Sequence, residues 1–206
     1  MLISKISQIV KTSLLITFLG LTASLAKAQI PEKPEDISPL LIGESIPDVT
    51  LWDAENQAIS LAAILKAKPT VLVFYRGGWC PFCNVQLSSL ARSQEEILKL
   101  GYQIVAVSPE DYQNIEPTKS NDKLNYSVYS DQNATLMKQI GIAFKMSQKS
   151  AQHISNKTKG TLTEILPVPS VFILNTSGKI LFEYINPDYK TRMSDDLLMA
   201  VLKAIK

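Results

Sequence analysis

The strongest hydrophobic signal in the chain is an uninterrupted apolar run at residues 70–75, rich in β-branched and aromatic side chains. Such a run is typical of a strand that is buried on both faces of a sheet. The segment that follows, residues 84–100, spaces its apolar residues as on one face of a helix. Pro81 falls in the expected first helical turn, where proline is tolerated. The side chains that we expect this helix to bury are Val85, Leu87, Leu90, Ile97 and Leu98.

Weaker patterns of the same two kinds predict the remaining elements. Strands are predicted at residues 46–51, 57–60, 102–107, 126–129, 170–174 and 179–185. Helices are predicted at residues 61–65, 134–140 and 193–205. Ser60 is a suitable N-cap for the first of these helices, and Gly141 is a suitable end for the second. The last helix is expected to bury Leu197, Leu198, Val201, Leu202 and Ile205.

The order of these elements indicates the fold class. Strands alternate with helices, and the chain ends in a hairpin followed by an amphipathic helix. This order predicts an α/β domain with a mixed central sheet flanked by helices. Residues 111–119 are expected to form a polar helix or loop. Residues 144–160 are polar and show little periodicity, so we expect an insertion over the surface.

The first 28 residues have the composition of a targeting segment. Their start is basic, residues 12–25 are apolar and almost uncharged, and residues 26–28, Ala-Lys-Ala, have the pattern that a signal peptidase cleaves. The apolar run is shorter than the ~20 residues of a membrane-spanning helix. We therefore expect a signal peptide at residues 1–28 and an exported protein, periplasmic or secreted. It would meet a membrane only through this segment before cleavage.

Removing that segment changes the charge balance. The whole chain carries a net charge of +2, and its first 28 residues hold three lysines and no acid, so the remainder carries −1. The apparent basicity belongs to the signal segment, and no nucleic-acid partner is expected. Residues 29–40 are rich in Pro, Glu and Lys and predict an extended linker. Residues 41–206 have the length of one domain.

The candidate chemistry lies between the apolar strand and the long helix, at Cys80-Pro81-Phe82-Cys83. Cys80 is expected at the helix N-terminus, where the dipole favours a thiolate by roughly 0.3–1 kcal/mol. Cys83 follows one turn later, close enough to form a small disulfide. This arrangement predicts a redox site in which Cys80 is the nucleophile and Cys83 is the resolving thiol.

Two other uses of a Cys-x-x-Cys pair fit the sequence less well. A structural zinc site needs about four ligands, and the chain has two cysteines and one histidine, so we expect no metal. A purely structural disulfide would close a loop too short to remove much unfolded-state entropy. Catalytic redox use is therefore favoured, and it requires no cofactor.

Residues 74–83, FYRGGWCPFC, resemble the active-site segment of the thioredoxin superfamily. More narrowly, the sequence is similar to the peroxiredoxin-like branch of the alkyl hydroperoxide reductase and thiol-specific antioxidant family. The segments that support this resemblance are residues 42–48, 105–108, 166–170 and 186–192. The resemblance covers residues 43–206 and implies a thioredoxin-like fold.

The resemblance implies an antioxidant, thiol-dependent peroxidase that reduces peroxides through Cys80 and Cys83. Its partner would be an external thiol reductant such as a thioredoxin-like protein. The alternative is a thioredoxin-like thiol–disulfide oxidoreductase whose substrates are protein disulfides. A binding or chaperone module with an inert disulfide is less favoured, because the thiol at the helix N-terminus would then have no use.

The resemblance leaves the attacking cysteine open. Peroxiredoxins carry a Thr-x-x-Cys motif whose last residue attacks the peroxide, and in that register Cys83 attacks while Cys80 replaces the threonine. Thioredoxins attack through the first and more exposed cysteine, which here is Cys80. Peroxiredoxins also carry a proline upstream of this motif. The corresponding position in this sequence is Arg76 or Val73, depending on the gap in the alignment.

Residues beside the cysteines are further candidates. Arg76 is expected to lower the pKa of the Cys80 thiol and to bind a polarised peroxide oxygen. Gly77 and Gly78 would let backbone N–H groups approach the sulfur or the substrate, and Trp79 would shield the sulfurs. Each of these residues also has a purely structural interpretation. Arg76 could be a solvated side chain at a strand end, the two glycines could only turn the chain, and Trp79 could be part of ordinary packing.

Other candidates follow from the resemblance alone. Pro169 matches the cis-proline that faces the cysteine pair in thioredoxin-like folds, so a cis bond after Val168 is expected. The Val168 backbone would then pair with an extended substrate segment. Arg192, in the segment that resembles the family's NPDYKTR, is a second candidate cation.

Two groups that often assist a catalytic cysteine, a buried acid and a histidine, are missing from the sequence around Cys80 and Cys83. Thioredoxins carry a buried acid six residues before the first cysteine, and here that position is Phe74. Glu44 and Glu110 are candidate replacements that would accept a proton from the resolving thiol. His153, the single histidine, lies in the polar insertion and is expected at the surface.

Overall fold

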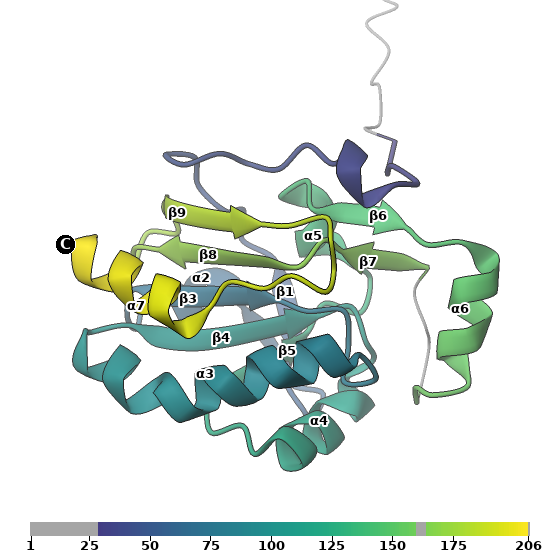
Figure 1. The fold of residues 1–206 in the computed structure, drawn as a ribbon, viewed down its shortest axis with the longest axis horizontal. Coiled ribbons are helices and arrows are strands. Elements are labelled where there is room, and N and C mark those ends of the chain that lie inside the picture. Colours follow the sequence, from purple (N-terminus) through teal and green to yellow (C-terminus); the bar gives the residue numbers. More distant parts are fainter. Residues whose placement is uncertain (1–28, 160–163, 206) are drawn as a thin grey trace, which may run out of the picture.

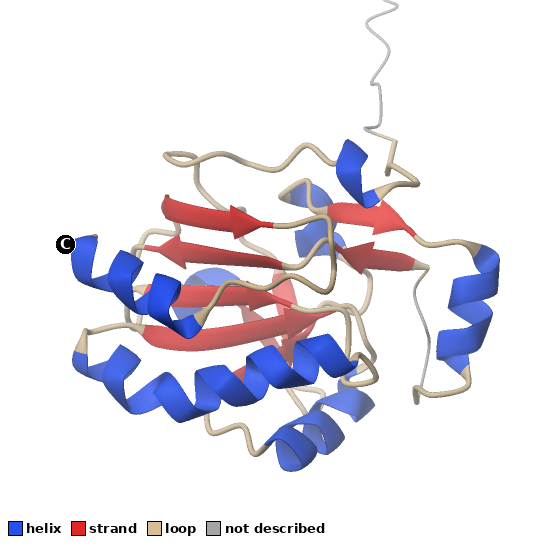
Figure 2. Cartoon of the chain, viewed as in Figure 1, coloured by secondary structure: helices blue, strands red, loops and turns tan. Residues whose placement is uncertain are grey.

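The computed structural model describes residues 29–159 and 164–205, so the predicted signal peptide at residues 1–28 lies outside the described part. Seven strands form a mixed sheet in the order β2-β1-β5-β4-β3-β8-β9, and β6 and β7 form a small second sheet. Helices cover the large sheet, as Figures 1 and 2 show. The predicted α/β class with a mixed central sheet is confirmed. No helix in the described ranges is long and apolar enough to cross a membrane.

The strands are short, and α3 is the longest helix among the described residues. The strands are β1 (Thr50–Trp52), β2 (Ala58–Ser60), β3 (Thr70–Phe74), β4 (Gln103–Ser108), β5 (Ser127–Ser130), β6 (Ala143–Lys145), β7 (Ile165–Pro167), β8 (Ser170–Leu174) and β9 (Ile180–Ile185). The helices are α2 (Leu61–Leu65), α3 (Pro81–Lys99), α4 (Ile115–Asp122), α5 (Thr135–Gln139), α6 (Gln148–Ser155) and α7 (Asp195–Ala204). Short 3-10 turns occur at Pro34–Asp36 and Tyr112–Asn114.

Strand β3 is the centre of the sheet, as its apolar run predicts. It pairs in parallel with β4 and antiparallel with β8, and all five of its residues are buried. Val71 and Val73 belong to the core on the α3 and α7 side, whereas Leu72 and Phe74 belong to the core on the α2 and α5 side. Burying one such side chain contributes about 1.5–3 kcal/mol. This double burial fixes the point at which the chain leaves β3.

Helix α3 begins at Pro81 with Cys80 as its N-cap residue, as predicted. Leu87, Leu90 and Ile97 are buried as expected, but Val85 and Leu98 are 70% and 40% exposed, so the prediction for these two is wrong. Val85 lies two positions from Leu87, and Leu98 lies one position from Ile97. Steps of one or two residues turn a helix by about 100–200°, away from the buried face.

The same helical geometry explains an error in the burial predicted for the last helix. Leu198 and Leu202 are buried, but Leu197 is 42% exposed, because a single step along α7 turns it out of the interface. The caps predicted from the sequence are present. The Ser60 hydroxyl accepts a hydrogen bond from the Ala63 N–H (3.2 Å), and Gly141 follows α5 with φ +73°.

The polar insertion is more ordered than its sequence suggests. Residues 144–159 contain part of β6 and the whole of α6, and Gly160, its predicted end, lies outside the described residues. Met146, Ile154 and Leu166 form a separate small core, against which Trp79 packs. Met146 follows β6 and Leu166 lies in β7, so the pairing of β6 with β7 brings these two residues together, and Ile154 of α6 packs on them. Local periodicity therefore gives no sign of this core.

Residues 29–40 have little regular structure, yet they lie against the domain. The Leu40 N–H donates to the Ile140 carbonyl (3.0 Å), and the Lys145 N–H donates to the Pro31 carbonyl (2.7 Å). Ile30 and Leu40 are partly buried against the α2 and α5 core. The segment that precedes the sheet thus runs along the edge formed by α5 and β6 (Figure 1).

We expect Gly141→Ala to destabilise the protein more than Gly101→Ala. Both glycines have positive φ, +73° and +92°, and an added Cβ at Gly141 would also overlap the Ser38 carbonyl oxygen, whereas Gly101 faces open space. Positive φ costs an alanine about 1–2 kcal/mol, and the overlap adds about 1–3 kcal/mol. Urea unfolding of both variants measures the difference. Equal losses would show that residues 29–40 do not contribute to stability through this contact.

Candidate active site

The two cysteines lie where β3 ends and α3 begins. The Tyr75 N–H makes the last ladder bond, to the Val107 carbonyl (3.1 Å), and the chain then turns away from the sheet. Gly77 has φ +146°, and a Cβ there would overlap the Trp79 and Glu110 side chains. The conformation and the space around Gly77 therefore both require glycine at this position.

Gly78 is also tightly packed, since a Cβ there would overlap the Thr118 hydroxyl. Its N–H donates to the Glu110 carboxylate (2.8 Å). This N–H is therefore used within the protein, and the binding role of the Gly77 and Gly78 segment stays a prediction. Its contribution is to hold the loop against the residues that follow β4.

Both cysteines are free thiols and both are buried. Cys80 is 1% exposed and Cys83 is fully buried, so the expectation of an exposed Cys80 is wrong. Cys80 belongs to the core on the α3 side of the sheet, and Trp79 packs against that core, consistent with the shielding predicted for it. Cys80 nevertheless borders an open cavity, whereas Cys83 is not among the residues that line it.

The two thiols differ in acidity because one donates a hydrogen bond to the other. The Cys83 side chain is the largest stabiliser of the Cys80 thiolate, followed by the Cys83 backbone, and the positive charges of Arg76 and Arg192 contribute further. Together they lower the pKa of Cys80 to about 6. Burial and this hydrogen bond raise the pKa of Cys83 well above its ordinary value. At neutral pH the pair is a Cys80 thiolate and a Cys83 thiol.

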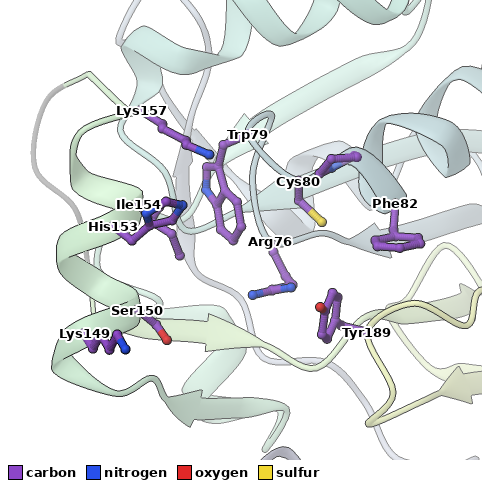
Figure 3. A pocket seen from close by; sticks show the side chains of 11 residues that line it. Arg76, Trp79, Cys80, Phe82, Lys149, Ser150, His153, Ile154, Lys157 and Tyr189 are labelled. Carbon is purple, nitrogen blue, oxygen red and sulfur yellow. The ribbon is translucent and has the colours of Figure 1, made fainter.

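Arg76 and Arg192 flank the pair, one beside each sulfur. The Arg76 guanidinium carbon lies 4.9 Å from the centre of the Trp79 ring and 4.4 Å from that of Tyr189, so the side chain is held between two aromatic rings rather than solvated (Figure 3). The Arg192 Nη2 lies 3.5 Å from the Cys83 sulfur. In the described part of the chain, the buried Nε of each arginine has no hydrogen-bond partner.

Glu110 is a buried acid in the loop after β4. It is 4% exposed, and its carboxylate accepts the Gly78 N–H. Burial raises the pKa of Glu110 to about 7, and the nearby Cys80 contributes to this rise. Glu44, the other candidate, accepts the Leu41 N–H (2.6 Å) in an exposed loop. A sequence signal for Glu110 exists, because the carboxyl ends of the parallel strands β3 and β4 meet at one edge.

Val168 and Pro169 do not have the conformation predicted for them. No peptide bond in the described ranges is cis. Val168 is buried, its N–H donates to the Ile142 carbonyl (2.8 Å), and its carbonyl accepts the Ser170 hydroxyl (2.7 Å). The Val168 backbone is thus used within the fold and is not free to pair with a substrate strand. The small sheet of β6 and β7, which the sequence did not suggest, leads directly into this position.

A cavity of about 480 Å³ opens beside Cys80. Near the sulfur it is lined by Arg76, Trp79, Phe82 and Tyr189, and its other wall is formed by α6 (Figure 3). His153 is exposed, as predicted, but it lines this cavity rather than an unrelated surface. No local pattern in residues 144–160 indicates that the polar insertion reaches the cysteine pair.

Comparison with known proteins places this site in a known family. The AhpC/TSA family model matches residues 42–182. Peroxiredoxin Bcp of Escherichia coli (strain K12) is 24% identical over 167 residues, which cover 81% of this chain and 98% of the relative. Chloroplastic peroxiredoxin Q of Oryza sativa subsp. japonica is 25% identical over 144 residues, which cover 70% and 58%.

The same likeness is present in solved structures. The crystal structure of peroxidoxin BcpB from Mycobacterium tuberculosis aligns with a TM-score of 0.62 at 21% identity, covering 80% of this chain and 97% of that one. Reduced Prx3 from Vibrio vulnificus aligns with a TM-score of 0.66 at 14% identity, covering 80% and 99%. These structures share the thioredoxin-like fold. Because the family model spans most of the domain and includes the cysteine pair, the chain belongs to the AhpC/TSA family.

Proposed function

We propose that this protein is a thiol-dependent peroxidase that reduces peroxides through Cys80 and Cys83. The observation that carries this proposal is a Cys80 thiolate, with a pKa of about 6, at the edge of a cavity and beside Arg76. Membership of the AhpC/TSA family supports it, as does the likeness to proteins named peroxiredoxins. No cofactor takes part in the reaction.

In the first step the Cys80 thiolate attacks the terminal oxygen of the peroxide. An S–O bond forms, the O–O bond breaks, and the sulfur loses two electrons to become a sulfenic acid. The leaving oxygen takes up a proton from solvent and departs as water or an alcohol. Arg76 stabilises the negative charge that develops on this oxygen, and it needs no reorganisation because the two rings already hold it.

In the second step the Cys83 sulfur attacks the Cys80 sulfenic sulfur. A disulfide forms and hydroxide leaves, which departs as water with the proton of the Cys83 thiol. Burial opposes ionisation of Cys83, and the positive charge of Arg192 favours it. Glu110 acts as a positioning residue, because it holds the Gly78 loop and its charge opposes that of the Cys80 thiolate.

The third step returns the disulfide to two thiols and needs an external reductant. We propose a thioredoxin-like protein that supplies two electrons through a dithiol. Phe82 and Val85, on the first turns of α3, are 40% and 70% exposed. These apolar side chains lie beside the pair and provide a contact surface for such a partner.

The second candidate function, reduction of protein disulfides, is less well supported. Its substrate would pair with the backbone beside Pro169, and the Val168 N–H and carbonyl are both used within the fold. The two functions are separated by stopped-flow consumption of hydrogen peroxide by the reduced protein, measured beside insulin reduction. Rapid peroxide turnover with slow insulin reduction supports the peroxidase, and the reverse result would overturn it.

We also propose that the mature protein begins after Ala28 and works outside the cytoplasm, in the periplasm or as a secreted protein. This proposal rests on the basic start, the apolar run and the Ala-Lys-Ala site of the first 28 residues. N-terminal sequencing of the protein recovered from cell fractions tests it.

Alkylation should label Cys80 before Cys83 in the reduced protein. Iodoacetamide reacts with thiolates, so the rate at Cys80 should rise to half its maximum near pH 6, while Cys83 stays slow because its pKa is raised. Mass spectrometry of the digested protein locates the label. Faster labelling of Cys83 would assign the attack to Cys83, as the peroxiredoxin register does.

Replacing Cys83 by serine should abolish turnover but not the first reaction. The variant should consume one equivalent of peroxide quickly to form the sulfenic acid, and a second equivalent more slowly as the unresolved sulfenic acid proceeds to sulfinic acid. Cys80→Ser is the matched control and should consume none. Sustained turnover by Cys83→Ser, without an added small thiol, would exclude Cys83 as the resolving residue.

Glu110→Gln should lower the pKa of Cys80 further. An ionised Glu110 opposes the nearby thiolate, and glutamine removes that charge while its oxygen still accepts the Gly78 N–H. The alkylation profile of Cys80 should shift slightly to lower pH. The gain in rate should be largest between about pH 6 and 7, where Glu110 begins to ionise and Cys80 is not yet fully a thiolate. Glu44→Gln is the control and should leave the profile in place. An unshifted Glu110→Gln profile would contradict the assignment.

A further inference from the structure

The loop that joins β9 to α7, residues 186–192, contributes to both ends of the cysteine pair. Its Tyr189 lies against the Arg76 guanidinium beside Cys80, and its Arg192 reaches the Cys83 sulfur. We infer that Asp188 is a positioning residue for the two cysteines, because it folds the turn that places Tyr189 and Arg192. This inference rests on the proposed function and names a residue that sets the charge around the same site.

Asp188 is the first residue of a tight turn. The Thr191 N–H donates to the Asp188 carbonyl (3.0 Å) and closes the turn. One oxygen of the Asp188 carboxylate accepts the Lys190 N–H (3.1 Å), and the other accepts the Thr191 hydroxyl (2.8 Å). Aspartate is favoured at this position because its side chain pairs with the backbone two residues on. The Lys190 N–H and then the Thr191 hydroxyl lower the pKa of Asp188, so its carboxylate is ionised at neutral pH.

The turn directs the Tyr189 ring toward Arg76. Tyr189 is the second residue of the turn, and its ring meets that of Phe82 edge to face, with centroids 5.8 Å apart. Figure 3 shows Arg76 with Trp79 on one side and Tyr189 on the other. A guanidinium is attracted to the face of an aromatic ring. The turn thus fixes one of the two rings that hold Arg76 beside Cys80.

The same turn holds the Arg192 guanidinium beside Cys83. The Arg192 Nη1 donates to the Thr191 carbonyl (3.2 Å), while Nη2 lies 3.5 Å from the Cys83 sulfur. A guanidinium presents its donors in a fixed fork, so the bond to Thr191 sets the direction of Nη2. Among the described residues, the ion pairs include neither Arg76 nor Arg192. The placement of Arg192 therefore depends on the turn rather than on a salt bridge of its own.

Asp188 consequently acts on Cys80 in two opposite ways. The turn that it folds holds the positive charges of Arg76 and Arg192, both of which stabilise the Cys80 thiolate. The negative charge of Asp188 by itself opposes a thiolate. A substitution that removes only the charge can therefore be told apart from one that removes both the charge and the turn.

The test compares Asp188→Ala with Asp188→Asn. The readout is the ultraviolet absorbance of the Cys80 thiolate across pH, with the same variant carrying Cys80→Ser as the baseline. Asparagine keeps an oxygen for the Lys190 N–H and an amide that can pair with the Thr191 hydroxyl, so its midpoint should not rise. Alanine loses both bonds, so its midpoint should rise, leaving about two- to threefold less thiolate near pH 6, the midpoint of the unmodified protein.

Thr191→Val is a second variant, which keeps the charge of Asp188 and loses one of its hydrogen bonds. Its midpoint should rise as that of Asp188→Ala does, but by less. The matched control is Asp53→Ala. One Asp53 carboxylate oxygen accepts the Glu55 N–H (3.0 Å) and the Gln57 N–H (2.7 Å) in the loop between β1 and β2, at the edge of the sheet opposite β9. This control removes the same charge and a similar turn, and it should leave the midpoint in place.

A higher midpoint in Asp188→Ala than in both Asp188→Asn and the unmodified protein supports the inference. Any other order of the three midpoints, or an equal rise in Asp53→Ala, would overturn it. The titration uses no peroxide, so its result is independent of the proposed activity. Failure of the unmodified protein to consume hydrogen peroxide would instead overturn the proposed peroxidase.

Discussion

The hydrogen bond from the Cys83 thiol to the Cys80 thiolate is the interaction on which the site depends. It exists because the two residues are one helical turn apart at the start of α3, and α3 starts there because β3 ends at a fixed point of the sheet. The bond stabilises the Cys80 thiolate and at the same time lowers the acidity of Cys83. One contact therefore separates the nucleophile from the thiol that waits to resolve it.

A thiolate that is 1% exposed needs compensation for its burial, and the structure supplies it from several directions. Arg76 acts from the cavity side and Arg192 from the Cys83 side, while Glu110 opposes both from beneath the glycine loop. A buried pair of cations without an acid would stabilise the thiolate more strongly. A more stable thiolate is a weaker nucleophile, so the opposing charge of Glu110 limits the stabilisation of the Cys80 thiolate and preserves its reactivity.

The sequence predicts most of the fold because the elements around the site have strong local patterns. The apolar run at residues 70–75 favours a buried strand, and Pro81 is typical of a helix start. The errors have two causes. Val85, Leu98 and Leu197 are apolar, which favours burial, but helical geometry turns them outward. The β6–β7 sheet, α6 and the arrangement at Val168 depend on contacts distant in sequence, which periodicity does not encode.

The same distinction separates the parts of the site by how firmly the fold holds them. The cysteine pair, its arginines and the end of β3 are fixed by the large sheet, whose two cores allow little change in this region. Helix α6 rests on a core of only three buried residues, so its exposed face can vary with little cost to the rest of the domain. The cysteine pair and the α6 wall of its cavity are thus supported by separate cores. Trp79 contacts both cores, and it connects α6 to the loop that holds Cys80.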